Sequence, residues 1–166
     1  MKYFTKWLAA GALLLPLIGC GGGGGSKVGS IVGTWRTTGI GQIGDSGSAL
    51  VSCPGSITVG GETVECDTQP RYFGADGFFL SYYEEDGRIG RLTGSYTHVD
   101  NEIQITLEED AIDRDGSGTF SGDEIEELIV PVTYTLTIGR LDSDSIGMTF
   151  DDGDIRYVVV MGRNEE

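Results

Sequence analysis

Residues 113–124 read DRDGSGTFSGDE and carry an oxygen-bearing group at nearly every second position. Calcium binds six to eight oxygen ligands at about 2.3–2.6 Å, so a short loop that holds it must wrap around the ion. Gly118 falls where such a loop turns sharply, and Phe120 supplies an apolar residue after the turn. The predicted ligands are Asp113, Asp115, Ser117, the carbonyl group of Thr119, Ser121 (directly or through water) and both carboxylate oxygens of Glu124.

This stretch resembles the calcium loop of EF-hands, which has ligands at positions 1, 3, 5, 7, 9 and 12 and glycine at position 6. EF-hand loops lie between two helices, whereas QITLEE and LIVPVTYTL on either side of this loop read as strands. At most one helical turn fits before the loop, at Glu109–Ile112, and two fit after it, at Asp123–Leu128. The stretch DSDSIGMTFDDG is not a second loop, because Gly153 stands where the glutamate is required.

We therefore predict a single calcium site that orders an inserted hairpin and acts as a structural clip rather than as a switch. Extracellular calcium modules of this kind have dissociation constants of about 10⁻⁴–10⁻³ M. The alternative is a solvated acidic hairpin tip without metal, because Asp, Ser and Gly are common throughout the chain.

The elements that must position this loop read as short strands. In PVTYTLTIG, Val132, Tyr134, Leu136 and Ile138 alternate with three threonines, and EIQITLE alternates in the same way. Dense turn signals such as Asp86-Gly87 separate eight to ten such segments. The predicted fold class is all-β, an antiparallel up-and-down β-barrel with the calcium loop inserted between two strands, since closure removes exposed sheet edges.

The N-terminus has the layout of a secretory signal: two lysines precede an apolar run of about a dozen residues, too short for a membrane span of roughly 20. The run ends in Leu17–Cys20, which resembles the lipobox of bacterial lipoproteins. The resemblance implies that residues 1–19 are a signal peptide that is removed and that Cys20 is acylated. The alternative is an ordinary cleaved signal with a chance cysteine.

A Gly-rich tether at residues 20–29 follows the lipobox and separates the lipid from one domain at residues 30–164. Because Gly21 rather than aspartate follows Cys20, the lipoprotein sorting rule of enteric-type bacteria implies the outer membrane. We expect a lipid-anchored protein of the bacterial cell envelope, in an oxidising space, on either the periplasmic or the surface side.

The charge of the chain excludes some partners. Lys2 and Lys6 belong to the signal, so the chain from Cys20 has nine basic residues against 26 acidic ones, a net charge of −17. This balance argues against nucleic acid and against anionic membrane surfaces, and it favours solubility and cation binding.

Cys53 and Cys66 are predicted to form a disulfide in this compartment. The residues between them, PGSITVGGETVE, read as a hairpin with its turn at Gly60-Gly61. A two-residue turn there pairs Cys53 with Thr68, so we expect a bulge or a longer, irregular loop to bring the two sulfur atoms together. The alternative, a reactive dithiol, lacks Cys-x-x-Cys spacing and a basic neighbour.

The motifs IVGTWRTT, YFGADGFFL, GRLTGSYTHVDNEIQITL and YTLTIGRLDSDSIGMTFDDGDIRYVVVMGR resemble, in this order, the bacterial lipocalin-like (calycin-type) lipoprotein domain. The resemblance implies that Trp35 plugs one end of the barrel under an arginine, for which we prefer Arg163 to Arg156. The chain departs from that family in a long Gly-rich first connection and in an insertion at residues 108–131. GTW and LTGSY also resemble the avidin family, but its later ligand-contacting tryptophans have no counterpart, and we predict no biotin binding.

Nothing in the sequence marks an enzyme. His98 is the single histidine, and zinc would need more nitrogen or sulfur ligands than the chain offers. The leading prediction is a barrel that binds a small apolar ligand in its mouth. The alternative is a filled barrel with no small ligand, which acts as a structural or interaction lipoprotein of the envelope through contacts with proteins or polysaccharide. Protein partners and oligomeric state are not predicted.

Overall fold

The computed structural model describes residues 30–44, 47–59, 62–152 and 155–164. The predicted signal peptide, Cys20 and the tether lie outside the described residues. Within them, no helix has the length and apolar character that crossing a bilayer requires.

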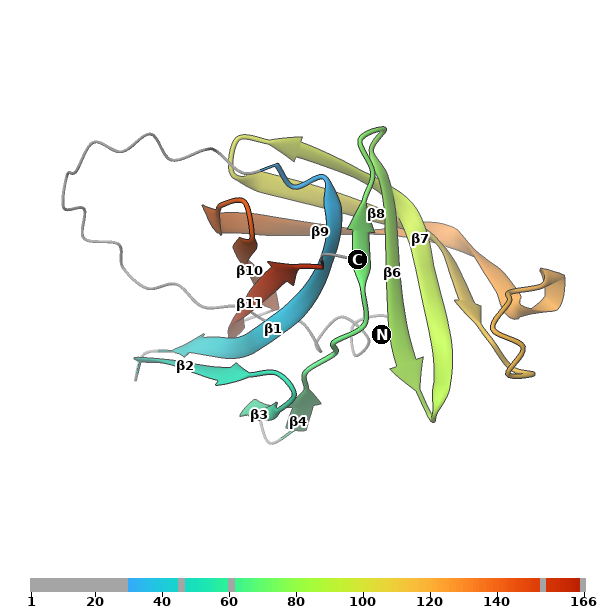
Figure 1. The fold of residues 1–166 in the computed structure, drawn as a ribbon, viewed down its shortest axis with the longest axis horizontal. Coiled ribbons are helices and arrows are strands. Elements are labelled where there is room, and N and C mark those ends of the chain that lie inside the picture. Colours follow the sequence, from blue (N-terminus) through green and yellow to red (C-terminus); the bar gives the residue numbers. More distant parts are fainter. Residues whose placement is uncertain (1–29, 45–46, 60–61, 153–154, 165–166) are drawn as a thin grey trace.

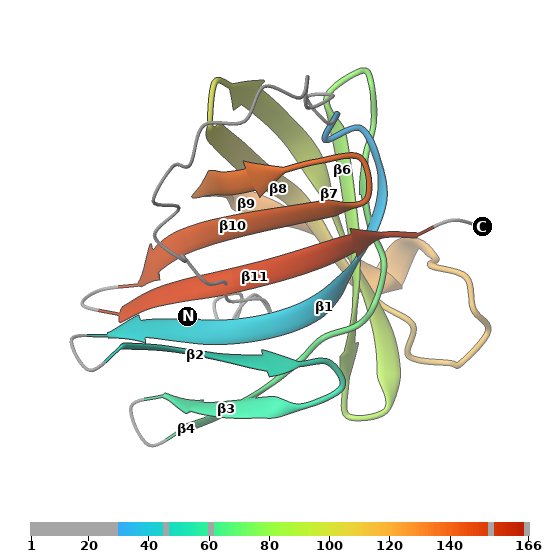
Figure 2. The ribbon, with the colours of Figure 1, turned by 60° about the vertical axis from the view of Figure 1, so that its left-hand side comes forward.

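Eight antiparallel strands close into a barrel (Figures 1 and 2). The strands follow one another around the wall as β1, β5, β6, β7, β8, β9, β10 and β11, and β11 returns to β1. Closure runs from the Trp35–Arg163 pair to the Ile43–Arg156 pair. This confirms the predicted all-β, up-and-down barrel. The bounds are β1 Gly33–Gly44, β5 Arg71–Phe73, β6 Phe78–Glu85, β7 Arg88–Val99, β8 Glu102–Ile112, β9 Ile125–Leu141, β10 Ser145–Asp152 and β11 Ile155–Arg163.

Strand β1 has two partners along one edge. Its start pairs with the three-residue strand β5, and its end, from Gly39 to Gly44, pairs with β2 (Gly47–Ser52). A separate hairpin of β3 (Ser56–Val59) and β4 (Glu62–Glu65) follows β2 in the chain. The long first connection noted in the sequence is therefore a folded extension of the barrel wall, and Figure 2 shows it beside β1.

Two apolar clusters form the core. The larger fills the barrel with buried side chains from all eight of its strands, including Trp35, Phe73, Phe79 and Met161. The smaller joins Ile40 of β1 and Tyr157 of β11 to the hairpin residues Ile57, Val59 and Val64. The hairpin is thus attached to the barrel by burial of its own apolar face, as the period-two alternation of its buried positions requires.

The strand register that a two-residue hairpin turn predicts is confirmed, but the predicted route to the disulfide is wrong. Val59 pairs with Glu62 and Ser56 with Glu65, the register of a two-residue turn without a bulge. The chain instead bends between β2 and β3, so that Cys53 lies outside the hairpin ladder while the Cys66 amide donates to the Gly55 carbonyl at 2.7 Å. Cys53 and Cys66 form the disulfide, with their Cα atoms 5.7 Å apart.

The region around the predicted calcium loop is more extended than expected. β8 continues to Ile112, through the segment where at most one helical turn could fit, and a single 3₁₀ turn at Gly122–Glu124 precedes β9. The irregular part of the predicted 108–131 insertion is therefore limited to residues 113–124. Strand pairing explains the difference, because Glu109 to Ala111 still have ladder partners on β9.

Glu108 interrupts both ladders of β8. On the β7 side, Gly94 pairs with Leu107 and Thr93 with Glu109, so Glu108 is skipped. On the β9 side, Leu107 pairs with Val132 and Glu109 with Glu127. Four residues of β9 therefore lie opposite Glu108 without a ladder partner on β8. The hairpin tip beyond Glu108 therefore has a register of its own.

Candidate metal centre

Three carboxylates of the predicted calcium loop converge. Asp113, Asp115 and Glu124 each offer a carboxylate oxygen, and these atoms lie within 4.8 Å of one another. Asp113 and Glu124 are buried at 7% and 6% exposure, whereas Asp115 is exposed. Acidic groups this close repel one another, so the arrangement depends on the donors that surround it.

Backbone amides hold the two aspartates. The Asp113 carboxylate accepts hydrogen bonds from the Ser117 amide at 3.0 Å and from the Gly118 amide at 2.8 Å. The Ser117 amide also donates to Asp115 Oδ1 at 2.9 Å. Gly118 has a φ of 75°, a left-handed conformation that costs glycine little, which agrees with its expected place at the sharp turn.

Glu124 is held from both sides of the loop. The Arg114 amide donates to one carboxylate oxygen at 2.7 Å, and both the amide and the hydroxyl of Ser121 donate to the other at 3.0 Å. Of the remaining predicted ligands, Ser117 Oγ donates to the Thr119 carbonyl at 3.2 Å. Ser117 connects this carbonyl group to the carboxylates, because its amide donates to both Asp113 and Asp115.

These donors favour the ionised form of the acids. The hydroxyl and amide of Ser117 lower the pKa of Asp115, and the amides of Ser121 and Arg114 lower the pKa of Glu124. Both groups therefore stay charged at pH values where an unperturbed carboxyl begins to take up a proton. Ionised oxygen ligands on a short loop suit a hard divalent cation.

The loop is fixed to the barrel wall at two points. The Asp113 amide donates to the Ile89 carbonyl of β7 at 3.0 Å, which brings the start of the loop to the neighbouring strand. The Arg91 guanidinium lies 4.7 Å from the centroid of the Phe120 ring. This cation–π contact gives Phe120 a docking role that its place in the loop pattern did not indicate.

The barrel end marked by Trp35 is closed. Trp35 is fully buried, and the Arg163 guanidinium, not that of Arg156, lies 4.3 Å from its ring centroid. Arg163 donates to the carbonyl groups of Ser30, Val32 and Ser143, at 2.8, 3.0 and 2.6 Å. The stack thus joins the two ends of the domain, and its chemistry is structural. Arg156 instead forms an exposed ion pair with Asp151.

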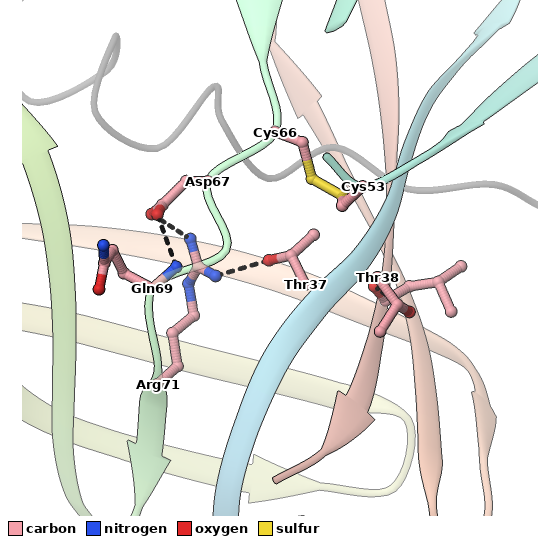
Figure 3. Close-up of a disulfide and its surroundings, with 8 residues drawn as sticks. Thr37, Thr38, Cys53, Cys66, Asp67, Gln69 and Arg71 are labelled. Carbon is pink, nitrogen blue, oxygen red and sulfur yellow. Dashed lines mark hydrogen bonds and ion pairs between the residues drawn. A yellow bond between two sulfur atoms is a disulfide. The ribbon is translucent and has the colours of Figure 1, made fainter. Parts of the chain in front are cut away.

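The sequence did not predict the buried ion pair between Arg71 and Asp67. Arg71 of β5 is 4% exposed, and its guanidinium donates to Asp67 Oδ2 at 3.0 Å and to Thr37 Oγ1 of β1 at 2.7 Å. Figure 3 shows this cluster directly after Cys66, in the segment that leads from the hairpin to β5. It ties the disulfide-linked extension to the barrel wall.

His98 is exposed, and its Nε2 atom lies 3.1 Å from the Asp100 carbonyl at the β7–β8 turn. It therefore does not line the barrel interior. This contact lies at the turn between β7 and β8, where Asp100 has a φ of 55°.

No protein-family model matches the chain, and no curated protein matches it in sequence. Three crystal structures resemble its arrangement. A lipocalin-like protein from Bacteroides uniformis is 13% identical, with 81% of this chain and 98% of that one covered and a TM-score of 0.44. A streptavidin-like protein from Bacteroides eggerthii is 14% identical, with 78% and 80% covered and a TM-score of 0.45. An uncharacterized protein from the same species is 18% identical, with 81% and 100% covered and a TM-score of 0.44. The barrel assignment itself rests on the strand pairing of this chain.

Proposed function

We propose that the protein is a lipid-anchored lipoprotein of the bacterial cell envelope whose barrel binds calcium in residues 113–124. The observation that carries the calcium proposal is the convergence of the Asp113, Asp115 and Glu124 carboxylates within 4.8 Å. Ser117, Ser121 and the Thr119 carbonyl supply the further oxygens that a coordination number of six to eight demands. The donor set contains oxygen alone, which favours calcium over zinc.

Calcium is expected to stabilise the folded chain, because it binds the native loop and not the unfolded one. With a dissociation constant of about 10⁻⁴ M, 10 mM calcium adds roughly 2.7 kcal/mol to the free energy of unfolding. A domain of this size then gains roughly 10 °C in melting temperature. Differential scanning calorimetry with calcium and with EDTA measures the difference.

The Glu124→Gln variant provides the matched test, because it keeps the shape of the side chain and removes the bidentate charge. We expect it to lose the calcium response, while Glu84→Gln, on the exposed end of β6, keeps it. Identical melting curves for the unaltered protein in calcium and in EDTA, with no heat in a calcium titration, would show that the loop is only a polar hairpin tip.

The proposal also includes a lipid anchor on Cys20, which is supported by the lipobox at Leu17–Cys20. Denaturing mass spectrometry of protein purified from the bacterial membrane is expected to show acyl chains on Cys20 as residue one. Cys20→Ser protein is expected in the soluble fraction. An unmodified Cys20 in membrane-purified protein contradicts the anchor.

The packing of the barrel favours an interaction or structural role over storage of a ligand. Side chains that line a cavity expose area to it, yet the interior residues Trp35, Phe79, Ile103, Ile105, Leu107 and Ile146 are each 0% exposed. A small apolar ligand is the second candidate, because Val132, Tyr134 and Ile138 on the interior face of β9 are only partly buried. A native mass spectrum with a co-purified ligand supports this second candidate.

A further inference from the structure

The outer face of β7, β8 and β9 carries an ordered array of uncharged polar side chains. In one row Ser95 pairs with Thr106 and Thr106 with Thr133, and in the next Thr97 pairs with Gln104 and Gln104 with Thr135. All of these are exposed except Thr106, which is half-buried. Figure 1 shows the three strands side by side. Neighbours lie about 4.8 Å apart across strands and about 6.8 Å apart along them.

The array is held in place before any partner binds. The hydroxyl oxygens of Thr106 and Thr133 lie 3.2 Å apart, within hydrogen-bond distance. Threonine side chains have a restricted χ1 angle, and the sheet fixes their backbone. Hydroxyl groups presented in this way lose little conformational entropy when they bind a polar ligand.

Charge is absent from these two rows although the same strands carry it elsewhere. The chain has a net charge of −15, and exposed Glu102 and Glu108 lie on β8 at the two ends of the array. Further acids, among them Glu109 and Glu126, follow on the way to the calcium loop. Strand propensity alone explains threonine on an exposed strand, but it does not explain a neutral zone bounded by acids.

An exposed aromatic ring extends the first row. Phe78 of β6 pairs with Ser95 and is 41% exposed. Tyr72 of β5, 40% exposed, approaches the same loop glycine, Gly74, as Phe78 does. The face therefore combines hydroxyl and amide groups with apolar ring surface at one margin and carboxylate acceptors at both ends.

We propose that this face, Ser95, Thr97, Gln104, Thr106, Thr133 and Thr135 with Phe78, binds an uncharged polysaccharide. Sugar hydroxyls donate to Glu102 and Glu108 and exchange hydrogen bonds with the array, and the C–H face of a sugar ring covers Phe78. An acidic glycan or a second copy of this chain must approach a net charge of −15, which opposes both. An uncharged polyol meets no such repulsion.

This inference rests on the proposed envelope location and is independent of the calcium site. The test is affinity electrophoresis of the full-length protein, in a neutral detergent, through gels that contain dextran, galactomannan or hydroxyethyl cellulose. We expect at least one of these uncharged polymers to retard the protein, and alginate, which is anionic, not to. The retardation is expected to persist in Glu124→Gln protein and in EDTA, so that failure of the calcium site and failure of the glycan site are distinguishable.

Two variants locate the site. Thr135→Glu places a bulky charge in the array and is expected to weaken retardation at least fivefold, as is Phe78→Ser. Thr63→Glu makes the same exchange at an exposed position of β4 and is expected to change nothing. The proposal is overturned if none of the three polymers retards the protein or if Thr135→Glu migrates like the unaltered protein. Tighter binding to alginate, or a dimer that Thr135→Glu dissociates, also overturns it.

Discussion

Replacing Asp67 with alanine is expected to lower the free energy of unfolding by about 3–5 kcal/mol, the range for breaking one side of a buried ion pair. The loss arises because the Arg71 guanidinium, 4% exposed, is left buried without its carboxylate partner, while its hydrogen bond to Thr37 Oγ1 remains. Urea denaturation followed by the fluorescence of buried Trp35 measures the change.

The chain offers a control that matches Asp67→Ala in charge and chemistry. Asp151 forms an ion pair with Arg156, but the two side chains are 57% and 50% exposed. Asp151→Ala is therefore expected to change stability by about 1 kcal/mol or less. Equal effects of the two substitutions would contradict the claim that burial makes the Asp67 pair important.

A double variant separates the uncompensated charge from lost packing. Arg71→Met removes the guanidinium, and in the Asp67→Ala background it is expected to restore at least half of the loss. Replacement of a buried pair by apolar groups is often nearly neutral. A double variant less stable than Asp67→Ala would mean that Arg71 stabilises the wall mainly through Thr37.

Loss of the Cys53–Cys66 disulfide, whose cysteines are 13 positions apart, is expected to reduce the free energy of unfolding by about 3 kcal/mol, the loop-closure value for a loop of about this length. The Cys53→Ser, Cys66→Ser double variant, or reduction of the unaltered protein, produces this change. The expected site of loosening is the β3–β4 hairpin, which is joined to the barrel through the smaller apolar cluster around Ile40 and Tyr157.

Hydrogen exchange distinguishes this local effect from a general one. Amides of β3 and β4 are expected to lose protection while those of β7 and β8 keep theirs, because the barrel ladder does not pass through the hairpin. A reductant added to the double-serine variant serves as the control and should change nothing further. Uniform loss of protection around the whole barrel would contradict a local brace.

The strands and the turns were predictable because their signals are local. The alternation of Val132, Tyr134, Leu136 and Ile138 with threonine marks β9, and the two-residue turn predicted from the sequence gives the observed β3–β4 register. The disulfide was also predictable, from the expected oxidising compartment and from the two cysteines that remain besides Cys20. Its route was not, because the bend between Cys53 and Ser56 sets the β3–β4 hairpin against Tyr157 of β11, a contact between distant segments.

The buried cluster at Arg71 could not be read from the sequence for a related reason. Asp67 and Arg71 are four residues apart, a spacing that indicates a pair on a helix, yet they lie in a coil and at the start of a strand. Thr37, the third member, comes from β1 and is 34 positions away. The array on β7–β9 is equally hidden, since its rows depend on registers that shift at Glu108.

The double interruption at Glu108 has a consequence for how the protein can change over time. Beyond this residue the pairing with β9 has its own register, so a residue gained or lost in the loop at residues 113–124 does not shift the pairing of the barrel strands behind it. Selection can lengthen the loop or exchange its acidic residues, while the wall that carries the rows of threonine stays aligned.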